Sequence, residues 1–370
     1  METYTKDQAQ VVVTVNNRDY QGWIESNIQR SIENISSRFT IPVSMVPGSP
    51  PDIHRQDDMK VYINKTLVVT GTVLAAEPFY KRDDCGFKIE GRSRTGDLIG
   101  CSAIYRGGQW KSAKLDQIAR DVCGQFVDVV VDADMGAALS DFKIEDGETV
   151  VNLLSRAARM RGILVTTNAR GQLLLTTAGK NRSHGAIVRG QNVISMESIG
   201  SDADRYSQYI GYGQKKSTGN FDEATQQKAS VFDSEMRRSL PLMVNVQGNT
   251  DTADIRRLLE HTMRVRRGHA YGLKYQLEGW TWEGKPWEIN TLVPIYDDIV
   301  GLNGDLWLIC EINNKCDLTE GDVTIITVRP PDAYDSEPIK PIKAPKKTNS
   351  GGKNKKSQIV DSRFNLRTDI

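Results

Sequence analysis

Apolar residues recur at every second position through the first quarter of the chain, which is the period of a β-strand with one buried face. The pattern is clearest in segments 11–15, 60–63 and 67–74, and polar turn pairs follow the first two at Asn16-Asn17 and Asn64-Lys65. Several short strands with regularly spaced turn signals favour a barrel or a sandwich. We therefore predict a small antiparallel β-barrel domain over residues 1–92.

The periodicity changes to that of helices between residues 93 and 185. Ser112 is a candidate N-cap and Gly124 a candidate stop for one helix, and Gly162 ends a second helix that begins near Val150. The apolar stripes are Leu115, Ile118, Ala119 and Val122 in the first helix, and Val150, Leu153, Leu154, Ala157 and Ala158 in the second. A hairpin is expected over 163–177, and the whole segment is predicted to be an inserted α+β domain.

Strand patterns return over residues 186–330, where one helix interrupts them after Asp251 or Thr252. The apolar stripe of this helix is Ile255, Leu258, Leu259, Thr262 and Met263, and its other face carries Arg256, Arg257, Arg264 and Arg266. We predict a second antiparallel β-barrel domain with one helix. The fold class is thus mainly β, with two similar small barrels, an α+β insertion and a flexible basic C-terminal tail.

The two β-rich parts resemble each other weakly. In each, a short alternating strand is followed by a turn, a longer apolar strand, a polar loop and a closing strand; the paired segments are 61–63 with 293–295, 67–74 with 306–312, and 87–91 with 323–328. Two copies of one barrel would explain this resemblance. The alternative is that any two antiparallel meanders look alike.

Charge is concentrated at the C-terminal end of the chain. The 370 residues contain 48 Lys and Arg against 47 Asp and Glu, a formal net charge of +1. Seven lysines and no acid lie in segment 340–356, so the rest of the chain carries −6. This near-neutral total, with 38% hydrophobic and 26% charged residues, is typical of a globular chain and argues against a dedicated nucleic-acid binder.

The tail over residues 331–370 is rich in Pro, Gly and Lys, a composition that cannot bury enough apolar surface to offset its ordering entropy. One interpretation is a frayed terminus. The other is a tether whose apolar end docks on a partner protein, with the candidate residues Lys340, Lys343, Lys346, Lys347, Lys353, Lys355, Lys356, Phe364 and Leu366.

No motif for catalysis, cofactor binding or metal binding is present. The sequence has no phosphate-binding glycine loop, no HExxH and no GxSxG, its four histidines are scattered, and its five cysteines lack CxxC spacing. We expect no enzyme activity, no cofactor and no metal, although a pair of carboxylates in a glycosidase needs no motif. Three tryptophans at 280, 282 and 287 could stack a base or a sugar, but core or interface positions are favoured. No run of about 18 apolar residues indicates a membrane span, and no secretory signal is expected.

Several short segments, in order and at consistent spacing, resemble the Mu-type baseplate hub family of contractile phage tails. The strongest is Ile-Tyr-Arg-Gly-Gly-Gln-Trp-Lys at 104–111, followed by 115–121; the others are 22–23, 30–33, 91–99, 148–150 and 159–164. The resemblance covers roughly residues 11–330 and is strong because of its collinearity. The lysine-rich tail is where the least correspondence is expected.

The resemblance implies a structural function. Hubs of this family, which is related to the hub of T-even phages and to type VI secretion spikes, form a homotrimeric ring that adapts the sixfold tail tube to the threefold central spike. Partners would be the tail tube protein, the spike protein and neighbouring baseplate proteins, with DNA only as passing cargo. The protein would be synthesised in the host cytoplasm and reside in the virion tail baseplate. The alternatives are a tail-tip peptidoglycan hydrolase and a nucleic-acid-binding β-barrel module.

Overall fold

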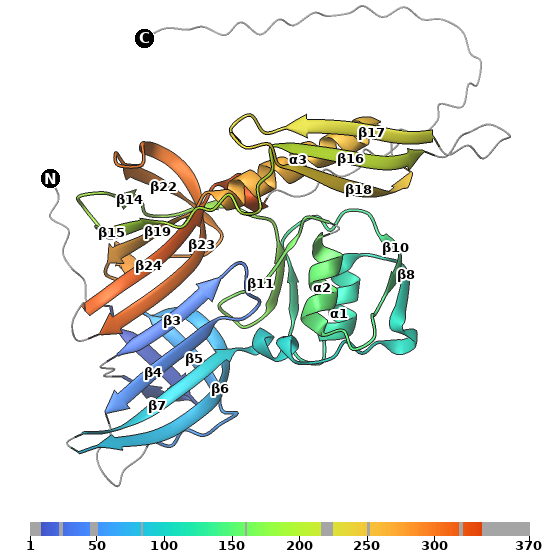
Figure 1. Ribbon diagram of the computed structural model, residues 1–370. Helices are drawn as coiled ribbons and strands as arrows, with labels where there is room; N and C mark the ends of the chain where they lie inside the picture. Colours follow the sequence, from blue (N-terminus) through green and yellow to red (C-terminus); the bar gives the residue numbers. More distant parts are fainter. Residues whose placement is uncertain are drawn as a thin grey trace, which may run out of the picture. The chain divides into compact units, whose positions relative to one another are not determined.

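The structure of the chain is a computed structural model. The structure describes residues 9–21, 25–44, 51–82, 84–159, 161–215, 225–249, 252–317 and 321–334. Strands predominate, and two helices lie in the middle of the chain and a longer one further on (Figure 1). The predicted fold class, mainly β with an α+β insertion, is confirmed.

The first β-rich part is an antiparallel meander with its apolar face turned inward. Alternation explains the burial: Val13, Val61 and Ile63 are fully buried, while their immediate neighbours along each strand are at least partly exposed. The strands are β1 (Val11–Val15), β2 (Arg18–Tyr20), β3 (Ser26–Ser31), β4 (Arg38–Ser44), β5 (Asp58–Ile63), β6 (Thr66–Lys81) and β7 (Asp84–Ser93).

The second β-rich part continues the same sheet. Its strands are β13 (Asn181–Arg182), β14 (Ile187–Val188), β15 (Val193–Ser198), β19 (Leu273–Glu278), β22 (Thr291–Asp297), β23 (Leu302–Asp317) and β24 (Gly321–Arg329). Eleven of the fourteen strands of this sheet follow the order β15-β19-β24-β23-β3-β4-β7-β6-β5-β1-β2, and the other three lie beside this path, where β22 pairs with β13, β14 and β23. A small hairpin of β20 (Thr281–Trp282) and β21 (Lys285–Pro286) precedes β22. The two parts are therefore hydrogen-bonded to each other, which the sequence pattern did not predict.

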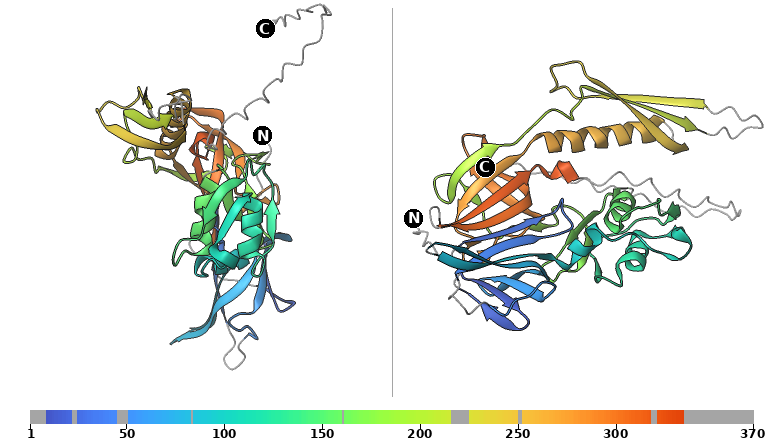
Figure 2. Two further views of the ribbon diagram at one scale, coloured as in Figure 1. Left: turned by 90° about the vertical axis from the view of Figure 1, so that its right-hand side faces the viewer. Right: turned by 60° about the horizontal axis from the view of Figure 1, so that its bottom comes forward.

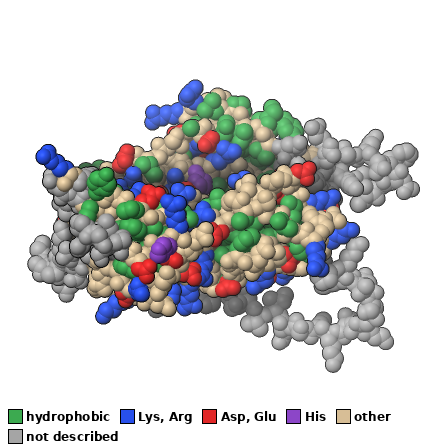
Figure 3. Space-filling model, turned by 90° about the horizontal axis from the view of Figure 1, so that it is seen from below, with side chains coloured by type: hydrophobic (Ala, Val, Ile, Leu, Met, Phe, Trp, Pro, Cys, Tyr) green, Lys and Arg blue, Asp and Glu red, His purple; other side chains and the backbone are tan. Residues whose placement is uncertain are grey.

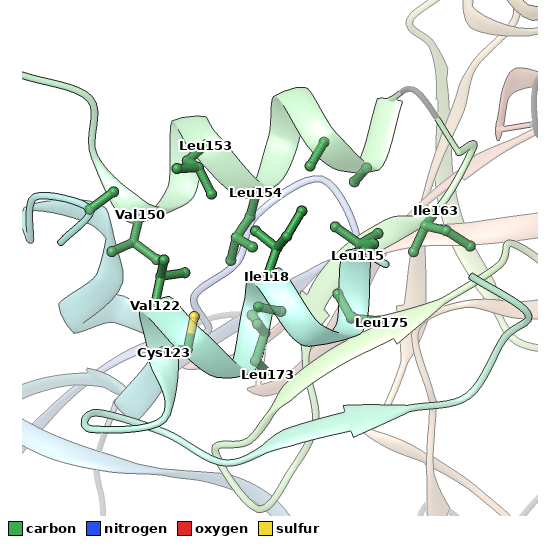
Figure 4. Packing of buried hydrophobic residues seen from close by; sticks show 14 of the residues in the cluster. Leu115, Ile118, Val122, Cys123, Val150, Leu153, Leu154, Ile163, Leu173 and Leu175 are labelled. Carbon is green, nitrogen blue, oxygen red and sulfur yellow. The ribbon is translucent and has the colours of Figure 1, made fainter. Parts of the chain in front are cut away.

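The inserted segment has two helices packed on short strands. Helices α1 (Leu115–Cys123) and α2 (Val150–Arg159) turn the predicted apolar stripes toward each other and toward the strand Leu173–Thr176, and these side chains are buried (Figure 4). Around them lie the 3-10 turns η1 (Arg94–Ile99) and η2 (Arg106–Gly108) and the strands β8 (Gln109–Ala113), β9 (Val129–Val131), β10 (Leu139–Lys143), β11 (Leu164–Thr167) and β12 (Leu173–Thr176). The predicted hairpin over 163–177 is confirmed as β11 and β12.

One detail of this segment corrects the sequence interpretation. Ser112 is not the N-cap of α1: it lies in β8 with a φ of 56°, and Lys114 occupies the N-cap position without a side-chain cap. A serine hydroxyl is a common N-cap, but Ser112 belongs to β8, which pairs with β10, and it therefore lies two residues before the N-cap position. The stop at Gly124 is confirmed, because its N–H donates to the Arg120 carbonyl.

Residues 208–270 form a further layer with its own core. The predicted helix is confirmed as α3 (Thr252–Ala270), and it packs along β16 (Gln208–Lys215) and β17 (Thr225–Phe232) (Figure 2). Strand β18 (Pro241–Asn249) lies parallel to β16, and these three strands pair with one another and not with the large sheet among the described residues. The described part of the range 186–330 thus contains strands of the large sheet, the separate sheet of β16, β17 and β18, and the small β20–β21 hairpin. The chain then ends its described course at η3 (Pro331–Tyr334), which contacts α3.

The internal repeat is confirmed by the backbone. Strands β5, β6 and β7 have the same order and nearly the same lengths as β22, β23 and β24, and β6 and β23 each span 16 residues. Both long strands carry an unpaired bulge residue at their third position, Val68 or Gly304, and another at their ninth, Leu74 or Cys310. Each pair of bulges is 236 positions apart.

The correspondence extends to the turn before each triplet. Gln56 and Asn290 both have a positive φ, and their N–H groups donate to Val73 and Ile309 at 2.8 and 2.9 Å. Val73 and Ile309 occupy the same position in their long strands. The repeat aligns Val61 with Ile295, two residues from the alignment that the sequence pattern suggested, because a shift of two keeps the same face buried.

Candidate assembly interfaces

The join between the two β-rich parts is an antiparallel pairing of β23 with β3. It runs from Glu311 opposite Ser31 to Cys316 opposite Ser26. The join is well buried, since Ile312, Asn314 and Ile28 are fully buried. Because β23 uses its first half for β22 and its second half for β3, one long strand serves both modules.

A buried polar network fixes the register of this join. Arg30, on β3, donates to the side-chain oxygen of Asn314 at 3.1 Å and to the Trp287 carbonyl at 3.0 Å. The Asn314 amide in turn donates to Thr324 Oγ1 at 3.1 Å. Burial lowers the pKa of Arg30 to about 10 despite the opposing effect of Glu288, so this guanidinium remains charged at neutral pH. A slip of one residue would leave these buried groups unpaired.

A second buried network holds the layer of β16, β17 and α3. Arg205 precedes β16 and donates through Nε and Nη2 to the two carboxylate oxygens of Asp233, at 2.7 and 3.0 Å. Glu235 also accepts from Arg205, and the Tyr271 hydroxyl donates to Glu235 at 3.1 Å. The side chains of Arg205 and Asp233 are only 4% and 2% exposed. The network therefore connects the entry to β16, the end of β17 and the end of α3.

Unpaired strand edges are the strongest assembly features of the described residues. Among the described strands, β15 pairs only with β19, and residues 75–80 of β6 pair only with β7. Large apolar side chains lie on or beside both edges: Tyr80 is 88% exposed, Leu74 47% and Ile194 49%. Such edges are templates for pairing with another chain.

Other exposed apolar side chains are scattered. Examples are Phe232 on β17 and Met243 on β18, together with Ile104 and Ile299, which lie in segments that connect elements. On the face shown in Figure 3, acidic and basic side chains are interspersed with hydrophobic ones, so this face has no large field of a single sign.

The predicted tether residues lie outside the described residues. These are Lys340, Lys343, Lys346, Lys347, Lys353, Lys355, Lys356, Phe364 and Leu366. The arginine face of α3 is in part structural: Arg266 donates to the Asp204 carbonyl at 2.8 Å and lies over the Tyr206 ring, while Arg256 and Arg257 are exposed.

The tryptophan cluster lies mainly in the core, which is one of the two positions, core or interface, that the sequence interpretation favoured. Trp280 and Trp287 are buried, and the rings of Trp282 and Trp287 meet edge to face at 6.1 Å. Trp280 packs into the core of the first β-rich part, although it belongs to the second in sequence, and its Nε1 donates to the Lys315 carbonyl at 2.8 Å. No local sequence signal could have indicated this exchange.

The described titratable side chains do not form a recognisable catalytic set. Burial raises the pKa of the Cys123 and Cys310 thiols to about 12, which keeps them protonated and unreactive. Within the described ranges, no three His, Cys, Asp or Glu side chains are grouped so that they could hold a metal ion. No helix in the described part is both long and apolar enough to cross a bilayer.

Three family models match successive parts of the chain. The first, described as Mu phage baseplate assembly protein GpP-like, N-terminal, matches residues 10–93. The second domain of the gp44-like baseplate hub protein matches residues 95–177, and the fourth domain of Mu phage baseplate assembly protein GpP matches residues 249–337.

Whole-chain relatives agree with these models. The baseplate hub protein gp44 of Escherichia phage Mu is 26% identical over 354 residues, which is 92% of both chains. The 43 kDa tail protein of prophage MuSo2 from Shewanella oneidensis is 31% identical with a TM-score of 0.77, over 89% of this chain and all of that one. A tail protein from Neisseria meningitidis has the same fold, with 19% identity and a TM-score of 0.74 over 88% of this chain and 99% of its own.

Fold, sheet edges and relatives together define a phage tail protein whose described features are structural. Within that class the chain belongs to the Mu-type baseplate hub family. The resemblance inferred from the sequence is thereby confirmed. The fold is also shared with an Escherichia coli type VI secretion component described as similar to T4 tail proteins, at 11% identity and a TM-score of 0.51, over 86% of this chain and 76% of that one.

Proposed function

We propose that three copies of this chain form the ring-shaped hub of a contractile tail baseplate and adapt a sixfold tail tube to a threefold spike. The observation that carries the proposal is the internal repeat, in which both long strands have bulges at the same two positions. A chain with two equivalent modules presents six of them in a trimer, which is what a threefold-to-sixfold adapter requires. The modules would correspond to residues 1–92 and 186–330, with 93–185 inserted between them.

The proposed stoichiometry is tested by the mass of the intact assembly. Native mass spectrometry of the purified full chain should give three times the protomer mass of 41.3 kDa. Obligate interfaces of this kind bury on the order of 2,000 Å² or more, so the trimer should persist on dilution. A stable single protomer at high concentration would contradict the proposal.

The central channel of the ring would let DNA slide past during ejection. A neutral or acidic lumen suits this role, because counterion release would make a basic lumen hold DNA. The charge of −6 outside the lysine-rich segment is compatible with it. A gel-shift assay at low salt should show no strong binding of duplex DNA by the trimer of a chain truncated before the lysines.

We assign the hub a structural role without catalysis, with the tail tube protein, the central spike protein and neighbouring baseplate proteins as its partners. Its place is the baseplate of the virion, after synthesis in the host cytoplasm. A zymogram on purified peptidoglycan tests the absence of hydrolase activity, and a cleared zone would contradict this assignment.

The C-terminal segment is proposed as a tether to a neighbouring baseplate protein or the spike. Deleting residues 335–370 should leave the trimer intact, because every described strand and helix ends before that point. The affinity of the truncated chain for the purified spike or baseplate neighbour, measured by co-sedimentation at low salt, should fall at least tenfold. A matched control replaces the seven lysines of 340–356 by Gln and keeps the length of the segment. It distinguishes an effect of the positive charge from an effect of the length of the tether. Loss of the trimer in the deletion would refute the tether.

A further inference from the structure

The repeat predicts a strand pairing that the single chain cannot make. Within the chain, the second module offers residues 311–316 of β23, and these pair with β3 of the first module. By the correspondence of the long strands, residues 75–80 of β6 are the equivalent of 311–316. These residues have no strand on their outer edge among the described residues.

The equivalent of β3 in the second module is β15. Strand β3 pairs with β4, with Ile28 opposite Phe39, and β15 pairs with β19, with Ser198 opposite Leu273. Phe39 and Leu273 are themselves equivalent: Phe39 is opposite Gly91 of β7, and Leu273 is opposite Val328 of β24. Gly91 and Val328 correspond, because they lie opposite the equivalent residues Val73 and Ile309 of the long strands. The strand that would pair with residues 75–80 is therefore β15, which a second copy of the chain must supply.

Burial differs sharply between the filled position, where β3 pairs with residues 311–316 of β23, and the unfilled position, which is the open edge of β15 and of residues 75–80 of β6. At the filled position Ile28 is fully buried and Cys310 is 2% exposed. Their counterparts at the unfilled position are Ser198, which is exposed, and Leu74, which is 47% exposed. The described chain thus leaves open to solvent the contact that its own repeat closes elsewhere.

The hydrogen-bonding groups of β15 point in the required direction. The Ile199 N–H donates to the Gly272 carbonyl on the β19 side at 2.9 Å. Successive residues of a strand alternate, so the N–H and C=O of Ser198 face the free edge. At the filled position the Ile32 N–H donates to the Cys310 carbonyl. Ile28 and Asn314 lie four residues further along the same ladder, so their N–H and C=O groups also point toward the partner strand, as those of Ser198 do toward the free edge.

We infer that β15 of one protomer pairs antiparallel with residues 75–80 of β6 in the next protomer, with Ser198 opposite Pro78 and Glu197 opposite Phe79. The inference rests on the proposed ring and names its interface. The contact is heterologous, since two different edges meet, and so it propagates head to tail and closes into a ring if the rotation permits. Each chain then donates one strand and accepts one.

Pro78 restricts which strands can bind. It lacks an N–H, so the pair of Pro78 with Ser198 keeps only the bond from the Ser198 N–H to the Pro78 carbonyl. Proline and charge on an edge are common protections against indiscriminate pairing, and Glu77, beside Pro78, is exposed and forms an ion pair with Arg55 at 3.5 Å. The edge therefore accepts a partner in one register rather than any strand.

Disulfide cross-linking tests the pairing and its register. Phe79→Cys combined with Glu197→Cys places the two cysteines in a directly opposed, non-hydrogen-bonded pair, whose Cα atoms are about 4.5 Å apart in such a ladder. Mild oxidation should convert more than half of the protein into covalent trimer on a non-reducing gel. Each single variant controls for the five native cysteines, and Phe79→Cys with Ser201→Cys, about 13 Å out of register, should stay uncross-linked.

The outcomes separate the pairing from the trimer. Native mass spectrometry of the reduced double variant reports the assembly state independently of cross-linking. A trimer without the in-register cross-link overturns the strand pairing and leaves the proposed trimer standing. A monomer at high concentration overturns both, and an efficiently cross-linked closed ring of another size supports the pairing and overturns the trimer.

A backbone variant provides a second readout. Ser198→Pro removes an N–H that faces the free edge and makes no hydrogen bond to another described residue. Ser198→Ala is the matched control that keeps the N–H. Ser198→Pro should raise the dissociation constant of the assembly at least tenfold, with the unfolding temperature of the isolated protomer unchanged. Equal assembly of both variants would contradict the proposed pairing.

Discussion

Replacing Trp110 by alanine should lower the free energy of unfolding of the inserted segment by about 3–5 kcal/mol, the usual cost of truncating a buried aromatic ring. Trp110 is only 3% exposed and stacks on Tyr105 with 4.4 Å between ring centroids. Its Nε1 donates to Asp121 on α1 at 2.8 Å, so the truncation also removes the bond that ties β8 to the helix. Hydrogen exchange should show lost protection in α1 and α2 while β5 to β7 keep theirs.

Trp110→Phe is the matched control for this experiment. It keeps an aromatic ring against Tyr105 and Phe142 but loses the hydrogen bond to Asp121, so a smaller loss of about 1–2 kcal/mol is expected. If Trp110→Ala left the exchange rates of both helices unchanged, the ring would not be part of the core. Uniform loss of protection across the whole chain would show instead that the segment does not unfold separately.

Replacing Asp233 by alanine should destabilise the layer of β16, β17 and α3 by about 3–5 kcal/mol, because it leaves the buried Arg205 guanidinium without its main partner. Glu235 is half-exposed and cannot replace both hydrogen bonds. Limited proteolysis in segment 233–240, between β17 and β18, should therefore accelerate strongly. Asp202→Ala is the control: Asp202 lies 3.4 Å from the same guanidinium but is 64% exposed, and its removal should change stability by less than about 0.5 kcal/mol.

The Asp233 carboxylate also predicts a dependence on pH. Burial by itself would raise its pKa, but the hydrogen bonds from Arg205 outweigh burial and hold the pKa of Asp233 below its usual value. A carboxyl group with a lowered folded pKa stabilises the fold above its unfolded pKa of about 3.9, and this contribution is lost as the pH falls through the folded pKa. Acid denaturation of Asp233→Ala should therefore be less steep than that of the unchanged protein. Identical acid slopes would contradict the assigned charge of this pair.

The spacing of apolar residues was enough to predict individual helices and strands. The stripes of α1 and α2 and the strand alternation of β1 and β5 follow from side-chain spacing alone, because burial of one face needs no knowledge of the partner. The Ser112 cap failed for the opposite reason: whether a hydroxyl caps a helix depends on where β8 pairs with β10. A core or interface role for Trp280 and Trp287 was favoured from the sequence around them, but the sequence did not indicate which module Trp280 would enter.

The candidate interface could be read only in part from the sequence. The repeat was visible as a weak resemblance, yet its register depends on bulges, and the bulge residues Val68 and Gly304, or Leu74 and Cys310, have no chemistry in common. A bulge is a property of the pairing between strands, so it leaves no mark that a single strand's sequence must carry. The free edges of β6 and β15 become recognisable only once their filled counterpart is seen.

The sequence by itself determined the resemblance to the family, the mainly β class and the two helices of the insertion, and it suggested two similar modules without deciding between a repeat and two unrelated meanders, since all of these depend on short segments and their order. Only the tertiary structure decided that β23 joins β3, that residues 208–270 form a layer of their own, and which edges stay open. The physical reason is that each of these features is a contact between segments far apart in the chain. The free energy of such a contact comes from pairing and burial, which are properties of two surfaces together and of neither segment alone.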